Sequence, residues 1–247
     1  GEYFFALAAT GPVFLLMSLR LPTIVAVRDE RLPDHAVNRL RLLATATAVA
    51  VSLGVGLVFS GWAESWSAFV AVVAFKAMEH FDDLKAGYFQ RNKEFRKAVS
   101  VKVARGLLYF VLLLVLVLLD FEFGTTLGVL TTAYALLWVI ISRPNLGMKN
   151  GGGSYALTAI KLGGALSLAG AISAAATNYS RIYIGLTLGA ATLGVFGALA
   201  YSATAYGLVV NALGQYYLPH LADASRSKRR YLRLVFASQL LSVAVGL

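Results

Sequence analysis

The chain has 247 residues, of which 58% are hydrophobic and 14% are charged, and its formal net charge is +10. Soluble domains are about 45–50% apolar and about 25% charged, so this composition excludes an ordinary soluble protein and indicates an integral membrane protein. The chain has no cysteine, which excludes disulfides and thiolate metal sites, and its 3 histidines have no metal-ligand spacing.

The first part of the chain contains apolar runs of about 17 to 25 residues, long enough for helices to cross a hydrocarbon core of about 30 Å. We expect these helices at 2–27, 42–60, 67–92, 103–119 and 125–142. Pro12 and Pro22 are expected to kink the first helix, which membrane helices tolerate when neighbours or water satisfy the freed carbonyls. The run at 103–119 is almost wholly aliphatic and is expected to contact lipid.

The second part of the chain begins after a glycine-rich, linker-like segment at 143–154. Further helices are expected at 155–177 and 193–218, joined by an amphipathic connection that lies along the membrane interface, and a last helix begins near residue 232. The chain opens and stops within apolar runs. We therefore expect about eight helices and a piece of a longer, transporter-sized protein.

The basic residues are distributed unevenly along the chain. Most of the 22 lie in alternate connections, at 28–41, 91–105, 143–149 and 226–233. The connections between these contain only Arg181. This is the positive-inside pattern, which predicts that the basic loops are cytoplasmic. The net charge therefore reflects membrane topology, so the expected surroundings are membrane lipids and no nucleic acid.

The expected helix at 67–92 carries a polar face. At about 100° per residue, Lys76, Glu79, His80 and Asp83 fall within an arc of roughly 100°. An ionisable side chain at bilayer depth costs at least ~2.5 kcal/mol, so such a cluster normally faces a bundle interior or a water-filled cavity. Asp82 and Lys85 point to another side of this helix, and we expect them to form a local ion pair.

A weak internal repeat relates the two parts of the chain. An offset of 192 residues aligns the helix at 2–27 with that at 193–218, and the following basic loop and helix stay in register. The two copies have the same orientation, which is a parallel repeat about an axis along the membrane normal. We expect residues 1–149 to hold first-lobe helices, without the first of them, and residues 150–247 to begin a second lobe.

Three segments carry a resemblance to a known family: GEYFFALAATGPVFLLMSLRLPTIVAV, EHFDDLKAGYFQRNKEFRKAVSVKVARGLL and TLGVFGALAYSATAYGLVVNALGQYYLPHLADA. They resemble the bacterial O-antigen or exopolysaccharide flippases of the MOP superfamily, relatives of the MATE exporters and the lipid II flippase. The resemblance implies an all-α polytopic transmembrane bundle with a MATE-like two-lobe fold. It also implies a non-enzymatic protein of the bacterial cytoplasmic (inner) membrane.

The same resemblance implies transport of an undecaprenyl-diphosphate-linked oligosaccharide from the inner to the outer leaflet by alternating access, for surface polysaccharide biosynthesis. It implies no cofactor, apart from H⁺ or Na⁺ as a coupling ion. A polysaccharide polymerase and other glycan-assembly proteins are the protein partners expected for such a transporter.

Basic side chains inside the expected helices are the candidates for contact with the diphosphate. Arg20, Lys76 and Lys161 are predicted to line a central cavity, because Arg and Lys form charge-assisted hydrogen bonds with phosphate oxygens. For Lys76 the alternative is an ion pair with Glu79 or His80, and for Lys161 it is snorkelling. Arg181 is predicted either to anchor at the headgroups or to meet the substrate at the outer mouth.

Glu79, Asp83 and His80 are the candidates for ion coupling. Like charges four residues apart on a helix raise a carboxyl pKa, which suits a proton or sodium relay. The alternative is that Glu79 and Asp83 neutralise Lys76 and His80, and that His80 is a hydrogen-bonded neighbour.

Two other functions compete with a flippase. A MATE-like exporter of cationic drugs would favour an acidic cavity, and Glu79 and Asp83 keep this alternative open. A membrane-embedded glycan polymerase or glycosyltransferase would need a catalytic loop outside the membrane, and the expected outward connections are too short for one.

Overall fold

The computed structural model describes residues 2–27, 32–58, 66–142 and 154–224, together with residues 232, 235 and 236. All regular structure in these residues is α-helical, which confirms the predicted all-α class for this part of the chain. The helices are α1 (Glu2–Met17), α2 (Leu21–Ala26), α3 (Asp34–Val58), α4 (Trp66–Arg91), α5 (Phe95–Leu118), α6 (Phe123–Ser142) and α7 (Ser154–Ala224).

Three of these segments are long and apolar enough to cross a membrane, namely α3, α5 and the Tyr155–Ala200 part of α7. Their length and composition indicate a membrane protein. On α5 the apolar side chains are widely exposed, as at Phe110 (65%) and Leu118 (76%), which is the distribution expected of a helix that faces lipid. The 26-residue α4 is equally long, but its charged residues lower its hydropathy.

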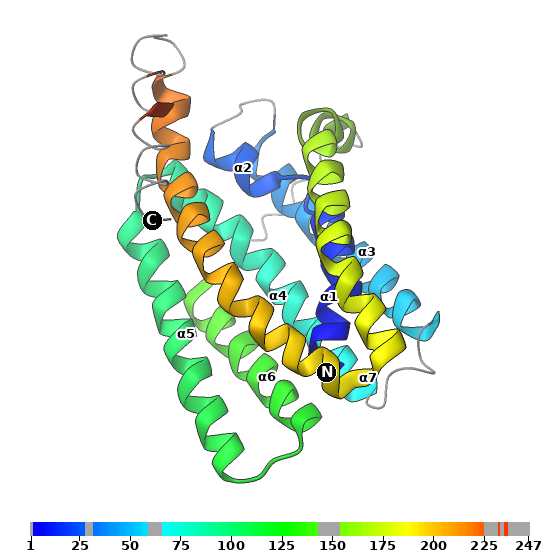
Figure 1. The fold of residues 1–247 in the computed structure, drawn as a ribbon. Helices are drawn as coiled ribbons and strands as arrows, with labels where there is room; N and C mark the ends of the chain where they lie inside the picture. The colour runs from blue at the N-terminus through cyan, green and yellow to red at the C-terminus, as the bar shows by residue number, and fades with distance from the viewer. Residues whose placement is uncertain are drawn as a thin grey trace.

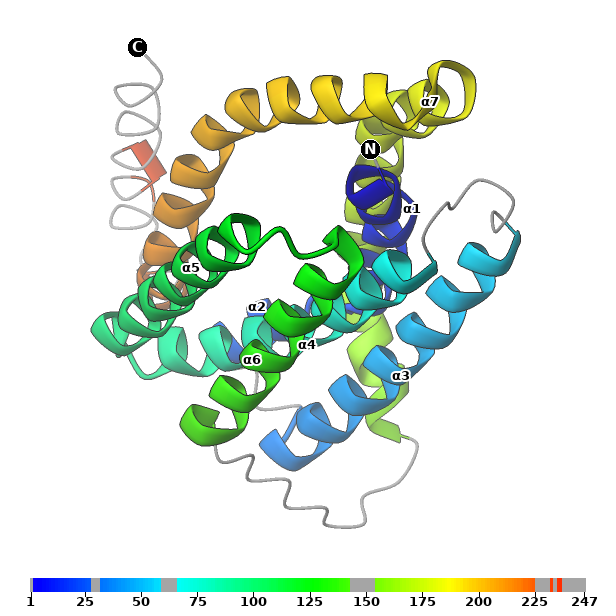
Figure 2. The same cartoon turned by 90° about the horizontal axis from the view of Figure 1, so that it is seen from below.

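The helices pack around α4, which contacts every other helix of the described structure. Figures 1 and 2 show α1 enclosed by α3, α4 and the first half of α7, while α5 and α6 lie on the other side of α4. One buried cluster, which includes Phe14, Ala48, Phe69 and Val72, joins α1, α3 and α4. The polar face predicted for residues 67–92 therefore belongs to the central helix of the bundle.

The first expected helix is broken in two. α1 ends at Met17, and α2 begins at Leu21 after Leu19 and Arg20 take left-handed φ values of 46° and 49°. Pro22 lies in the first turn of α2, where its missing N–H is not needed. The predicted kink near Pro22 is therefore confirmed, whereas Pro12 lies inside α1 without ending it.

Two helices begin about eight residues earlier than the sequence pattern predicts. α3 begins at Asp34 rather than 42, because the Pro33 carbonyl accepts the first helical hydrogen bonds and Asp34 supplies negative charge to the first turn. α5 begins at Phe95 rather than 103. Lys and Arg are good helix formers, so polar residues that resemble loops continue these helices.

The expected interfacial connection at 178–192 is not a separate segment. α7 is helical through this stretch and departs from helical geometry at Gly189, with φ 83° and ψ 171°. Gly189 tolerates this positive φ because it has no Cβ. Figure 2 shows α7 bending away from α1 so that its second half passes towards α5.

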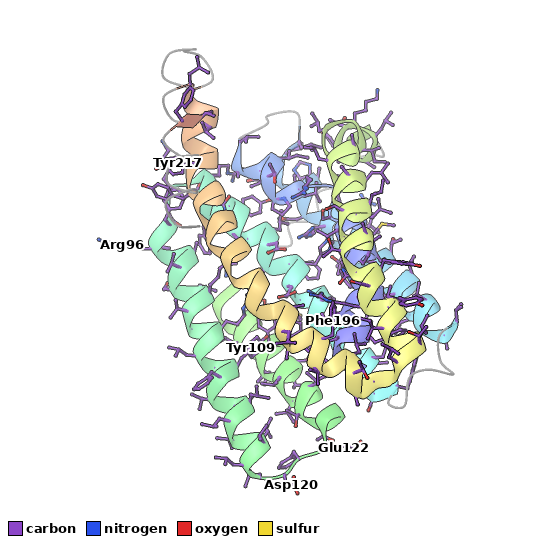
Figure 3. The ribbon with its side chains drawn as sticks, in the orientation of Figure 1. Arg96, Tyr109, Asp120, Glu122, Phe196 and Tyr217 are labelled. Atoms are coloured by element: carbon purple, nitrogen blue, oxygen red, sulfur yellow. The ribbon has the colours of Figure 1, made fainter. Side chains whose placement is uncertain are left out.

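Charged residues lie at both ends of the bundle. Figure 3 places Arg96 towards the end of the bundle that also holds α2, and Asp120 and Glu122 at the opposite end. The linker-like segment, the expected turn before Trp66 and most of the last helix lie outside the described residues. The two-lobe division near residue 150 stays a prediction.

Candidate functional site

The break between α1 and α2 is a short turn with its own hydrogen bonds. The Leu21 amide donates to the Ser18 carbonyl at 3.0 Å, and the Arg20 amide donates to the Ser18 hydroxyl at 3.3 Å. The Ser18 hydroxyl donates to the Leu15 carbonyl at 2.8 Å. A left-handed conformation costs a non-glycine residue roughly 1–2 kcal/mol, so surrounding contacts must hold Leu19 and Arg20 in place.

Two glycines let neighbouring backbones approach this turn closely. A Cβ on Gly163 of α7 would lie 2.8 Å from the Leu19 carbonyl carbon, and one on Gly87 of α4 would lie 3.0 Å from the Pro22 Cα. Such separations are too short for a side chain. The broken segment is therefore clamped between α4 and α7, and Ser18 also reaches Ser167 of α7 at 3.5 Å between hydroxyl oxygens.

Arg41 lies beneath the turn and is fully buried. Its NH1 donates to His80 Nε2 at 2.9 Å and, over a longer distance of 3.4 Å, to the Ser18 carbonyl. Within the described residues, its Nε and NH2 have no hydrogen-bond partner. Arg41 thus links α3 to α4 and to the break.

The hydrogen bonds of His80 fix its tautomer. Arginine can only donate, so His80 Nε2 accepts from Arg41, and Nδ1 carries the hydrogen that is shared with Thr45 Oγ1 at 2.8 Å. Thr45 in turn donates to the Arg41 carbonyl at 2.7 Å. The ring of Phe14 packs edge-on against His80 with centroids 5.6 Å apart. His80 is 5% exposed and is therefore a buried, neutral member of this network.

The other residues of the predicted polar face lie nearer the surface of the described structure. Lys76 forms an ion pair with Glu79 at 2.8 Å, with side chains 27% and 30% exposed. The local ion pair that was the alternative for Lys76 is therefore present. Asp83 lies one turn further along α4, is exposed, and interacts electrostatically with Arg41 and Glu79.

Asp82 has a partner that the sequence pattern did not predict. It accepts from Arg105 NH1 of α5 at 2.8 Å, and the same NH1 donates to the Tyr134 hydroxyl of α6 at 2.8 Å. Lys85 lies over the ring of Phe89, 5.6 Å from its centroid. The sequence pattern favours a local pair because Asp82 and Lys85 are three residues apart, but packing brings Arg105 to Asp82.

The remaining basic candidates lie on the break and on α7. Arg20 is partly buried, and its guanidinium lies 3.1 Å from the position of a Cβ on Gly170. Lys161 is exposed, and helical periodicity puts it about 160° around α7 from Gly163. Arg181 donates to Asn178 at 2.9 Å within α7. The structure thus places Arg20 where the break contacts α7. Lys161 projects from another side of α7.

The sequence pattern did not identify Arg41 or Thr45 as site residues, because it assigned Arg41 to a cytoplasmic loop. The available signal was the pair Pro33 and Asp34, a typical helix start. A helix beginning there carries Arg41 about two turns inside the membrane bundle and places Thr45 one turn further on.

These features indicate a helical membrane protein in which a buried network of Arg41, His80 and Thr45 lies beside a broken helix. No protein-family model matches the chain, and no solved structure matches it significantly. Among curated proteins, the chain is similar to the capsular polysaccharide biosynthesis protein CapF of Staphylococcus aureus, with 24% identity over 247 aligned residues. The match covers 93% of this chain and 59% of that protein, so the chain spans less than two thirds of the relative's length.

Proposed function

We propose that the full-length protein is a membrane transporter that flips an undecaprenyl-diphosphate-linked oligosaccharide across the bacterial cytoplasmic membrane. Three findings support this function. The chain is all-helical where it is described, several of its helices are long enough to span a membrane, and its curated relative is named for capsular polysaccharide biosynthesis.

The observation that carries the proposal is the position of Arg20 at the break. A helix interrupted within a membrane protein exposes backbone and side chains to the bundle interior rather than to lipid. Arg20 is partly buried there and faces α7 at Gly170. An anionic diphosphate needs positive charge to cross hydrocarbon, and a guanidinium offers charge-assisted hydrogen bonds to phosphate oxygens.

Lys76, Lys161 and Arg181 complete the proposed substrate path. Lys76 exchanges its ion pair with Glu79 for a phosphate oxygen when substrate is bound, which leaves Glu79 free to take up H⁺ or Na⁺. Glu79, Asp83 and His80 are the proposed ion-coupling residues, and no organic cofactor is needed. The helix ends that bear the basic segments are proposed to face the cytoplasm, where glycan-assembly proteins would build the lipid-linked oligosaccharide. A polysaccharide polymerase is the partner proposed on the other side of the membrane.

Separate Ala substitutions of Arg20, Lys76 and Lys161 in the full-length protein test this site. Each is expected to reduce surface polysaccharide at least several-fold while the protein remains in the membrane, because each removes one positive contact to the diphosphate. The matched control is Lys97→Ala, which removes an exposed cation near the start of α5. Normal surface polysaccharide in all three variants would refute the site.

A MATE-like, cation-coupled exporter of drugs or small molecules is the second candidate. The carboxylates of Glu79 and Asp83, one turn apart on the central helix, favour it. Loss of drug resistance with intact surface glycan in a deletion strain would select this alternative.

A further inference from the structure

Arg41 is the most deeply buried charged side chain of the described structure, yet the proposed transport path does not use it. We propose that Arg41 is a positioning residue that holds the break between α1 and α2, and with it Arg20, in the orientation seen here. The contact of Arg20 with a diphosphate rests on the proposed function. The positioning of the break by Arg41 does not depend on that function.

The break depends on outside support. Its two left-handed residues are Leu19 and Arg20, and neither is a glycine. The helix interruption leaves the Ser18 carbonyl at the junction of the two helices, where it accepts from the Leu21 amide and from Arg41 NH1. Arg41 thus reaches from α3 directly to the turn.

The network on the other side of Arg41 fixes where its guanidinium lies. NH1 donates to His80 Nε2 at 2.9 Å, and Thr45 bridges His80 Nδ1 to the Arg41 carbonyl. These contacts hold the guanidinium through its NH1 group. A donor held on α3 can thus determine the position of the Ser18 carbonyl, in the turn that follows α1.

A purely structural role for Arg41 would have a different consequence. If its contacts with His80 and Thr45 only join α3 to α4, then its loss would loosen the bundle as a whole. If Arg41 positions the turn, its loss would displace Ser18 relative to α7 and leave α1 packed on α7 elsewhere. Two contacts with α7 can distinguish these roles: one lies at the turn, and the other lies on α1 away from the turn.

Two cysteine pairs can report on these contacts, since the chain has no native cysteine. The turn pair is Ser18→Cys with Ser167→Cys, whose hydroxyl oxygens are 3.5 Å apart. The matched pair is Gly11→Cys with Asn178→Cys, because a Cβ on Gly11 lies 3.8 Å from the Asn178 amide nitrogen. Both pairs are placed in the full-length protein, freed of other cysteines, and treated in membranes with a short bis-maleimide, which adds to two thiols without an oxidant.

We expect Arg41→Met to lower cross-linking of the turn pair roughly tenfold, as the loss of a charged hydrogen-bond donor predicts, and to leave the Gly11–Asn178 pair unchanged. Arg41→Lys should retain most cross-linking of the turn pair. The described hydrogen bonds of Arg41 all come from NH1, and the lysine ammonium can replace this single donor group. Arg39→Met, an exposed change two residues away on α3, should affect neither pair.

Equal loss of both pairs in Arg41→Met would show that Arg41 holds the bundle rather than the turn, and unchanged cross-linking of both would show that it holds neither. Either result overturns the proposal. The measurement requires no transport, so it fails or succeeds separately from the proposed function. If cross-linking behaves as expected but Arg20→Ala leaves surface polysaccharide intact, the positioning by Arg41 stands and the proposed contact of Arg20 with the diphosphate is refuted.

Discussion

Gly163 on α7 has no room for a side chain, because the Leu19 backbone lies where its Cβ would be. We expect Gly163→Ala to lower the free energy of unfolding in detergent by about 2 kcal/mol, the usual penalty for overpacking. Gly164→Ala is the matched control, since its Cβ would meet only Ile160 Cγ2 at 3.4 Å. Equal thermal stability of the two variants would contradict the close approach of α7 to the break.

His80 offers a second test among single residues. His80→Phe keeps an aromatic ring beside Phe14 but removes the acceptor for Arg41 and the donor for Thr45. A buried arginine that loses its acceptor is strongly destabilising, so we expect a loss of about 3 kcal/mol in unfolding experiments. His35→Phe, a partly buried change beside Tyr155, should be nearly neutral. Equal losses would show that the His80 hydrogen bonds contribute little.

Some of these residues were predictable from sequence and others were not. Arg20 beside Pro22 indicates an opened helix, and the structure confirms a break there. The ion pair of Lys76 with Glu79 follows from their spacing on one helix. The partners of Arg41 and Asp82 come from other helices, and a single sequence gives no information on which helices pack together.

α4 and α5 are joined by the ion pair between Asp82 and Arg105, whose side chains are only 12% and 20% exposed. A double-mutant cycle with Asp82→Asn and Arg105→Gln should give a coupling energy of about 1–3 kcal/mol. The exposed pair of Glu94 and Lys97 at the start of α5 is the control and should give at most about 0.5 kcal/mol. Equal coupling in the two cycles would mean that Asp82 and Arg105 are effectively solvated.

Helix existence was easier to predict than helix ends. The apolar runs identified α4 and α6 almost to the residue, because their flanks are polar and turn-like. The polar residues before α3 and α5 continue those helices beyond the apolar run, so both starts were predicted too late. In α7, the segment at 178–192 looked like a connection, but it contains no proline, and Gly189 alone bends the helix.

Arg96 lies towards one end of the described bundle and Asp120 and Glu122 lie at the other, and the positive-inside pattern predicts that the Arg96 end is cytoplasmic. Single cysteines at Arg96 and Glu122, which lie at opposite ends (Figure 3), test this orientation. In spheroplasts, an impermeant maleimide should label Glu122→Cys, and it should label Arg96→Cys only after permeabilisation. The reverse labelling pattern would show that the protein has the opposite orientation in the membrane, and it would contradict the proposed direction of transport.

The central claim concerns the leaflet in which a lipid-linked oligosaccharide is found, and one measurement addresses it directly. In cells that lack the full-length protein, the undecaprenyl-diphosphate-linked oligosaccharide is assayed in spheroplasts by its sensitivity to an impermeant glycosidase. If the protein flips this intermediate, the intermediate should accumulate in a protected, cytoplasmic pool. It should become sensitive when the wild-type protein is restored, but not when the Arg20→Ala variant is supplied instead. An intermediate that reaches the outer leaflet equally well without the protein would contradict the proposed flippase activity.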